Sequence, residues 1–265
     1  MNDNIKVIKQ NPNAPEINIL ADKGVVLSNS DRVFFFDKKS DEVQPIASIT
    51  KLMTALVFLD NNPGWDTTYT ITGDDNVEGG KLNLFPGEEI KLKDIFKTSL
   101  IASDNGATLA LVHASGLSEE EFIKKMNEKA SELRLTNTKF IDSVGLSDNN
   151  VSTAREVALL AKEALSRSEI TDATESKGYQ FTTVNGREKV IESTDYLLFD
   201  SEENPFQVMG GKTGYTDKAG YCFVGRFKDT SGREIISVVL NSAGKNERFK
   251  ESKSLVNWVF SNYNW

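Results

Sequence analysis

Three short motifs along the chain combine a hydroxyl, an amine and an amide, which are groups that acyl transfer requires. Ser48 precedes Lys51 by three positions, and residues at that spacing lie on one face of a helix. The amine of Lys51 can therefore accept the proton of the Ser48 hydroxyl, which makes that oxygen a nucleophile. If Ser48 begins its helix, the unpaired N–H groups of the first turn can also stabilise an oxyanion.

The second motif is Ser-Asp-Asn at 103–105, and the third is Lys-Thr-Gly at 212–214. The Ser103 hydroxyl can relay a proton, and the Asn105 amide can hold a substrate carbonyl. The third motif lies in a predicted strand, whose edge can pair with a peptide substrate. There Lys212 adds positive charge, and the glycine lets a substrate approach closely.

Two of these motifs also occur a second time. The spacing of Ser48 and Lys51 recurs at 242–245, and Ser-Asp-Asn recurs at 147–149. A helix cap or a polar turn would account for any one motif without chemistry. Position favours Ser103, because predicted apolar helices on both sides would present it to a cleft, whereas Ser147 lies in a polar loop. All three motifs in this order indicate a known catalytic constellation.

The segments that position these motifs change character along the chain. Patterns typical of strands lie towards both ends, and helical patterns lie in the middle. Ser118 and Thr153 each begin a predicted capping box, with a glutamate three residues later. We predict strands over 24–29, 32–37, 179–184, 187–193, 206–213, 221–227 and 234–241, and helices over 48–59, 92–101, 106–114, 118–133, 153–166 and 245–263.

This order predicts a fold of the α/β (α+β) class, with an antiparallel sheet built from both chain ends, flanked by helices, and an all-helical subdomain inserted. We expect residues 1–22 to form a polar linker and 23–265 a single catalytic domain. Within it, 23–60 and 170–265 would form the α/β subdomain and 61–169 the helical one. The catalytic groups should lie at the seam between them.

Composition excludes several classes of function. The net charge of -8 makes the surface acidic, so nucleic acid is not an expected partner. With one cysteine, Cys222, and one histidine, His113, the chain offers no internal disulfide and no His- or Cys-based zinc site. We expect no metal and no cofactor; His113 should be a packed or surface residue of its helix, and Cys222 a small core residue of its strand. No apolar run is long enough to span a membrane.

The motifs and their flanks resemble the low-molecular-weight penicillin-binding proteins, the D-alanyl-D-alanine carboxypeptidases. The resemblance covers roughly Gly24 to the C-terminus. Its segments are 45–55 around Ser48, 101–107 around Ser103, a central block at 126–130, 136–140, 145–146 and 152–154, and 212–221 around Lys212. Arg134 and Val151 depart from the family pattern, which often has glycine and histidine there.

The resemblance implies a β-lactamase/transpeptidase-like fold and a serine peptidase that acts on the D-Ala-D-Ala end of peptidoglycan pentapeptides. β-Lactam antibiotics would be covalent inhibitors. The N–H groups of Ser48 and Tyr215 would form the oxyanion hole, and Arg248 would bind the substrate carboxylate. Thr213, Gly214 and Thr216 would line the substrate site. Since peptidoglycan lies outside the cytoplasmic membrane, we expect an extracytoplasmic protein whose export signal or membrane anchor precedes Met1.

Three alternatives remain open. A D,D-endopeptidase that cuts peptidoglycan cross-links has the same motifs. A class A β-lactamase would need a glutamate to activate the deacylating water, and 135–155 contains none. An inactive peptidoglycan-binding homologue would not need the intact motifs. In the peptidase mechanism, Lys51 must be neutral, and we expect the charge of Lys212, together with burial, to lower its pKa.

Overall fold

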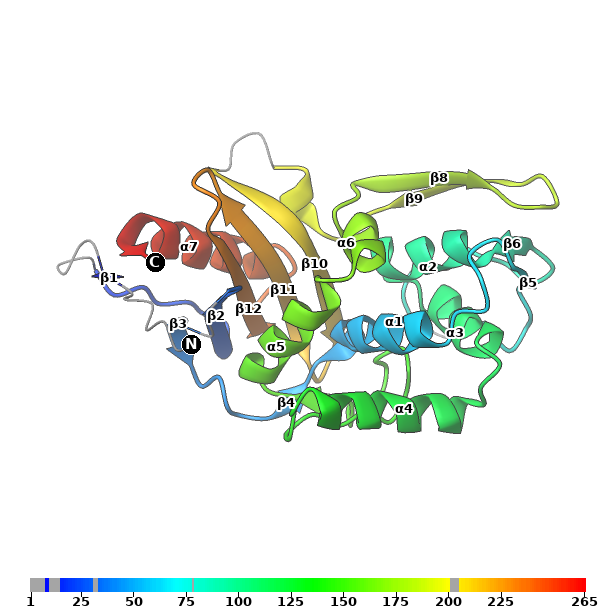
Figure 1. Cartoon of the computed structure of the whole chain (residues 1–265), viewed down its shortest axis with the longest axis horizontal. Helices are drawn as coiled ribbons and strands as arrows, with labels where there is room; N and C mark the ends of the chain where they lie inside the picture. The colour runs from blue at the N-terminus through cyan, green and yellow to red at the C-terminus, as the bar shows by residue number, and fades with distance from the viewer. Residues whose placement is uncertain (1–7, 10–14, 31–32, 78, 201–204) are drawn as a thin grey trace.

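A five-stranded antiparallel sheet joins the two ends of the chain (Figure 1). The computed structural model describes residues 8–9, 15–30, 33–77, 79–200 and 205–265. The strand order is β10-β11-β12-β2-β3, so β2 from the beginning of the chain pairs with β12 from its end. The strands are β2 (Lys23–Ser28), β3 (Phe34–Lys38), β10 (Phe206–Thr216), β11 (Gly220–Asp229) and β12 (Glu234–Ser242). This confirms the predicted sheet.

One helix covers each face of this sheet, α5 (Ala154–Ala164) and α7 (Glu247–Asn262). The side chains of a strand alternate between the faces. Accordingly, Val238 of β12 belongs to the apolar core that contains α5, and the adjacent Val239 belongs to the core that contains α7. Both faces are therefore buried in the middle of the sheet, which explains the nearly continuous apolar run of β12 from 235 to 240.

The second part of the molecule is a group of helices, seen beside the sheet in Figure 1. They are α1 (Thr50–Asp60), α2 (Leu92–Ile101), α3 (Asn105–Ala114) and α4 (Glu119–Glu132), preceded by the 3-10 turn η1 (Ala47–Ile49). In the core, Phe96 of α2 packs between Phe58 of α1 and Trp65, with ring centroids 5.9 Å and 5.2 Å away. A short helix, α6 (Ser168–Thr174), was not predicted.

The predicted capping box is complete at the start of α4, whereas only one of its two hydrogen bonds forms at the start of α5. Ser118 and Glu121 form a complete capping box at α4. At α5 the Thr153 hydroxyl accepts a hydrogen bond from the Glu156 N–H. The Glu156 carboxylate does not return to the helix start, because it accepts hydrogen bonds from Asn137 and neighbouring residues. It thereby ties α5 to the loop before it.

Smaller pairs of strands complete the fold. Strands β8 (Gly178–Thr182) and β9 (Glu188–Glu192) form the predicted hairpin, which stands apart from the main sheet. The other pairs are β1 (Ile8–Lys9) with β13 (Tyr263–Asn264), β4 (Gln44–Pro45) with β7 (Val151–Ser152), and β5 (Thr68–Thr70) with β6 (Glu89–Lys91). A second 3-10 turn, η2 (Tyr196–Leu198), precedes β10.

The described part of residues 1–22, the segment expected to be a linker, packs against α7. Trp258 donates a hydrogen bond to the carbonyl of Pro15, and the N–H of Ala21 donates to the Glu251 carboxylate. Ile19 and Ala21 are buried. The last residues of this segment therefore belong to the packed body of the molecule. Within the described ranges, no helix has the length and apolar character needed to cross a membrane.

Candidate active site

Ser48 lies in the 3-10 turn η1, two residues before the first residue of α1. The residue before it, Ala47, has a φ of 48°, in the left-handed region that side chains rarely adopt. The backbone at two glycines packs directly against this turn, where a side chain would not fit. A Cβ on Gly145 would lie 2.1 Å from the Ala47 carbonyl oxygen, and one on Gly214 would lie 2.8 Å from the Ile46 carbonyl oxygen. The packed backbone therefore holds the Ser48 hydroxyl in place.

Lys51 lies directly behind Ser48 and is fully buried. Its Nζ lies 2.9 Å from the Ser48 Oγ, and it donates to the Asn105 Oδ1 at 2.7 Å and the Val144 carbonyl at 2.6 Å. Burial lowers the pKa of Lys51 from 10.5 to about 7, although the charges of Asp104 and Asp142 oppose the change. The pKa of Lys51 is therefore lowered, as expected, but the main cause is burial and not the charge of Lys212.

Lys212 of β10 and Ser103, which lies just before α3, form a second amine–hydroxyl pair. The Lys212 Nζ donates to the Ser103 Oγ at 2.7 Å and to the Thr213 carbonyl at 3.0 Å. Burial and, after it, the charge of Lys51 hold the pKa of Lys212 well below its usual value. Ser103 has a φ of 57°, and the Asp104 side chain caps α3 immediately after it. This turn presents the Ser103 hydroxyl to Lys212.

A cleft of about 780 Å³ connects these groups. Lys51 and Lys212 lie behind its wall. Eight of the ten predicted site residues line it: Ser48, Ser103, Asn105, Thr213, Gly214, Tyr215, Thr216 and Arg248. The structure thus brings all ten into one region.

The third motif lies on β10, which is the edge strand of the sheet in the described part of the chain. An edge strand has unpaired N–H and C=O groups, so β10 can pair with an extended peptide in the cleft. The Thr213 hydroxyl shares a 2.7 Å hydrogen bond with Thr194. Tyr215 is half-exposed and stacks on Tyr221, with ring centroids 4.3 Å apart. One wall of the cleft is therefore aromatic.

Arg248 is buried at the start of α7, although it lines the cleft. Its Nη1 donates to the carbonyls of Gly214 and Cys222, at 3.1 Å and 3.3 Å. Its guanidinium lies over the rings of Tyr221 and Phe249. Its buried Nε has no partner among the described residues. Arg248 is thus held beside β10 and keeps one N–H without a partner among the described residues.

Several groups of the site were not found from the sequence. The Val144 carbonyl binds Lys51, and the Gly79 carbonyl accepts from the Asn105 amide at 2.8 Å. Thr194 and Lys245 line the cleft. Paired glycines at 79–80 are a signal for a close backbone approach, but backbone carbonyls and Thr194 carry no such signal.

The repeated motifs have structural roles. Ser242 donates to the Glu251 carboxylate, while Lys245 donates to the Tyr196 hydroxyl. Ser147 and Asn149 hydrogen-bond within the loop that also provides Val144. Among the described residues, neither repeat has a contact between its own side chains like the one between Lys51 and Ser48. The single histidine, His113, pairs with Asp75 at 2.7 Å and does not line the cleft.

Comparison with known proteins agrees with this geometry. The model of the D-alanyl-D-alanine carboxypeptidase family, peptidase family S11, matches residues 8–244. The chain belongs to this family. The S11 peptidase is 37% identical to a D-alanyl-D-alanine endopeptidase of Haemophilus influenzae, over 81% of this chain and 73% of that protein. It is 32% identical to the D-alanyl-D-alanine carboxypeptidase DacF of Bacillus subtilis, over 92% of this chain and 63% of that protein.

A solved structure supports the fold of this S11 peptidase. Penicillin-binding protein D2 of Listeria monocytogenes, in a cefotaxime-bound form, superposes with a TM-score of 0.80 and 31% sequence identity. The match covers 93% of this chain and 99% of that one. The predicted β-lactamase/transpeptidase-like fold and the predicted family are therefore confirmed.

Proposed function

We propose that this S11 peptidase removes the terminal D-alanine from peptidoglycan pentapeptides through an acyl-enzyme on Ser48. The observation that carries the proposal is the 2.9 Å contact between the Lys51 amine and the Ser48 hydroxyl. A nucleophile and its base must lie within hydrogen-bond reach, and the base must be able to lose its proton near neutral pH. Lys51 satisfies both conditions.

In the first step, the Ser48 oxygen attacks the carbonyl between the two D-alanine residues as its proton moves to Lys51. A tetrahedral oxyanion forms, for which the backbone N–H groups of Ser48 and Tyr215 are the proposed donors. The C–N bond then breaks, and the leaving amine takes up a proton. Ser103 is placed to relay to this amine the proton that Lys51 accepted, because its hydroxyl lines the cleft and is held there by a hydrogen bond from Lys212.

The leaving D-alanine carries a carboxylate, which needs a cation on that side of the cleft. Arg248 provides it at a fixed position, and Thr213 provides a hydroxyl on the strand beside it. Water then attacks the acyl carbonyl as one of its protons moves to Lys51, the bond to Ser48 breaks, and Lys51 passes that proton to the Ser48 oxygen. The acyl chain would lie along β10 between Gly214 and Thr216.

Penicillins should acylate the same serine, and hydrolysis should release the resulting acyl group slowly. The loop from 135 to 155 has no glutamate, and its Asp142 carboxylate is occupied by the N–H groups of Val144, Gly145 and Ser147. In the described part of the chain, the carboxylates that line the cleft are Glu192 and Asp217, both exposed. Neither of these two carboxylates is buried beside Ser48, where a β-lactamase would need one to activate a deacylating water.

The proposed substrate sets the location of the protein. Peptidoglycan lies outside the cytoplasmic membrane, so we place the domain on the extracytoplasmic side. Peptidoglycan and β-lactams are the proposed partners, and nucleic acid is not one.

Mass spectrometry of the penicillin adduct tests this function. We expect one adduct, on Ser48, and none on the Ser48→Ala variant. The matched control is Ser147→Ala, which alters the repeated motif and should be labelled like the wild type. Release of D-alanine from a linear pentapeptide should follow the same pattern. An adduct on another serine, or full labelling of Ser48→Ala, would disprove the mechanism.

A D,D-endopeptidase is the second candidate function. It is favoured by the 37% identical relative that carries that name. The chemistry at Ser48 would be the same, and the leaving amine would belong to a second peptide stem instead of a single D-alanine. Digestion of linear and cross-linked muropeptides distinguishes the two activities.

A further inference from the structure

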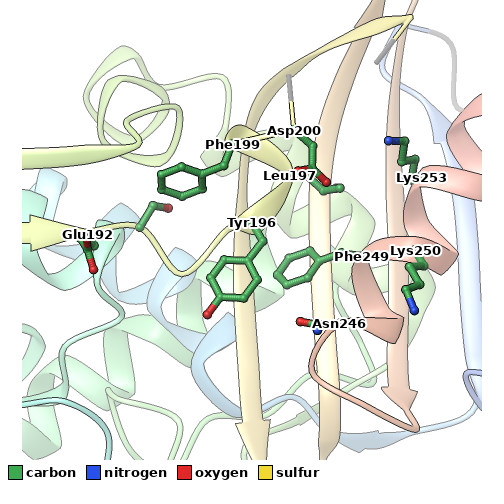
Figure 2. Close-up of a pocket in the computed structure, with 10 residues that line it drawn as sticks. Glu192, Tyr196, Leu197, Phe199, Asp200, Asn246, Phe249, Lys250 and Lys253 are labelled. Atoms are coloured by element: carbon green, nitrogen blue, oxygen red, sulfur yellow. The ribbon is translucent and has the colours of Figure 1, made fainter. Parts of the chain in front are cut away.

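A second hollow of about 640 Å³ lies next to the catalytic cleft (Figure 2). Three residues, Glu192, Ser193 and Tyr196, form part of the wall of both. Tyr196 stands at the boundary. Its hydroxyl accepts a hydrogen bond from Lys245 of the cleft wall, and its ring packs against Phe249 with centroids 5.5 Å apart. The two hollows are therefore neighbours separated by one aromatic side chain.

The hollow begins where the leaving group of the proposed reaction would end. Arg248, the proposed partner of the leaving carboxylate, lies over the ring of the adjacent Phe249 with 4.8 Å between the guanidinium carbon and the ring centroid. Phe249 in turn lines the hollow. A peptide that continued beyond the residue bound by Arg248 would thus reach Tyr196 and Phe249. A terminal D-alanine would end at Arg248 and leave the hollow unused.

The walls combine apolar and charged side chains. Tyr196 and Phe199 are large aromatic residues with 41% and 49% of their surface exposed, which is a high exposure for such side chains. Lys250 and Lys253 of α7 lie on one side and Glu192 on the other, and Asp200 is a second carboxylate of the wall (Figure 2). Lys250 pairs with Glu247 at 2.8 Å, whereas Lys253 has no ion-pair partner among the described residues.

From this arrangement we infer that the hollow is a subsite for a leaving group longer than one amino acid. Its occupant is the second stem of a cross-linked peptide, which leaves through the side-chain amine of a diamino acid. The aliphatic part of that residue packs on Tyr196 and Phe199. A carboxylate further along the stem pairs with Lys253. The inference rests on the proposed acyl-enzyme chemistry and assigns a specificity to it.

Kinetics on two substrates test the subsite. For wild type and variants, we would measure kcat/KM for a linear pentapeptide muropeptide and for a cross-linked dimer, and the rate of acylation by penicillin. Lys253→Glu reverses the unpaired charge, and Phe199→Ala removes apolar surface. Both residues are on the surface, so the fold should persist. The matched control is Lys124→Glu, a charge reversal on α4 at a side chain that is 75% exposed.

We expect Lys253→Glu and Phe199→Ala to lower kcat/KM for the dimer by about tenfold, through lost charge pairing and lost apolar contact respectively. The linear peptide and penicillin should change by less than about twofold, and Lys124→Glu should leave both substrates unaffected. Equal losses on both substrates, or no loss on the dimer, would overturn the subsite. A wild type that hydrolyses only the linear peptide would also overturn it, with the proposed function intact. A wild type that penicillin does not acylate would overturn the proposed function itself.

Discussion

Acylation of Ser48 should follow the protonation state of Lys51. Burial lowers the pKa of this amine from 10.5 to about 7. At pH 7 about half of the Lys51 amines are then neutral, whereas at a pKa of 10.5 only about one in 3,000 would be. The buried position therefore increases the amount of active base on the order of a thousandfold. Below pH 7 the neutral fraction falls tenfold per pH unit, so the rate at pH 5 should be about one hundredth of the plateau.

The assay is the second-order rate of acylation by a fluorescent penicillin between pH 5 and pH 9, with circular dichroism at each pH to show that the fold persists. The matched variant is Lys51→Arg, whose guanidinium keeps a positive charge but does not deprotonate in this range. Penicillin should acylate this variant slowly, and the acylation rate should not rise around pH 7. A rate that is constant from pH 5 to pH 8, or a Lys51→Arg variant with the wild-type profile, would refute the role of Lys51 as base.

Three further changes have expected outcomes. Burial raises the pKa of Asp195 from 3.8 to about 7, so the folded state binds the extra proton and stability falls as pH rises between these values. Asp195→Asn should therefore raise the free energy of unfolding in urea at pH 8, by up to about 4 kcal/mol, and change it little at pH 4; equal effects at both pH values would contradict this. Gly145→Ala, whose Cβ would meet the Ala47 carbonyl at 2.1 Å, should slow penicillin acylation by about a hundredfold, and a wild-type rate would show that the turn can move. Phe58→Ala should cost about 3–5 kcal/mol of stability in the same urea assay, and a cost below about 1 kcal/mol would mean that the helical core refills the space.

Elements with a strong local pattern could be predicted from the sequence. Helix α2 was predicted at its observed bounds, 92–101, because its apolar residues recur with helical spacing. The strands of the hairpin β8–β9 were predicted from their residue types, but the turn is longer than the two residues left between the predicted strands, because pairing ends at Thr182 and Glu188. Helix α6 has only seven residues, which is too short for a periodic pattern to emerge. Its formation depends on packing instead.

The side chains of the site could be predicted, but the backbone that holds them could not. The motifs around Ser48, Ser103 and Lys212 each combine residue types with a chemical use. By contrast, the bond from Lys51 to the Val144 carbonyl joins positions 93 residues apart, and any residue at 144 could make it. The left-handed φ of Ala47 is likewise imposed by its surroundings, since alanine has no local preference for it. Such features arise from tertiary packing.

The pairing of β2 with β12 has a consequence for the nascent chain. During synthesis, β2 emerges early, but its partner at 234–242 is made about 200 residues later. Gly214, which packs against the turn of the nucleophile, also comes late. A growing polypeptide that has passed Ser48, Lys51 and Ser103 therefore still has no reactive centre. The enzyme becomes competent only when strands β10, β11 and β12 have been made and close the sheet.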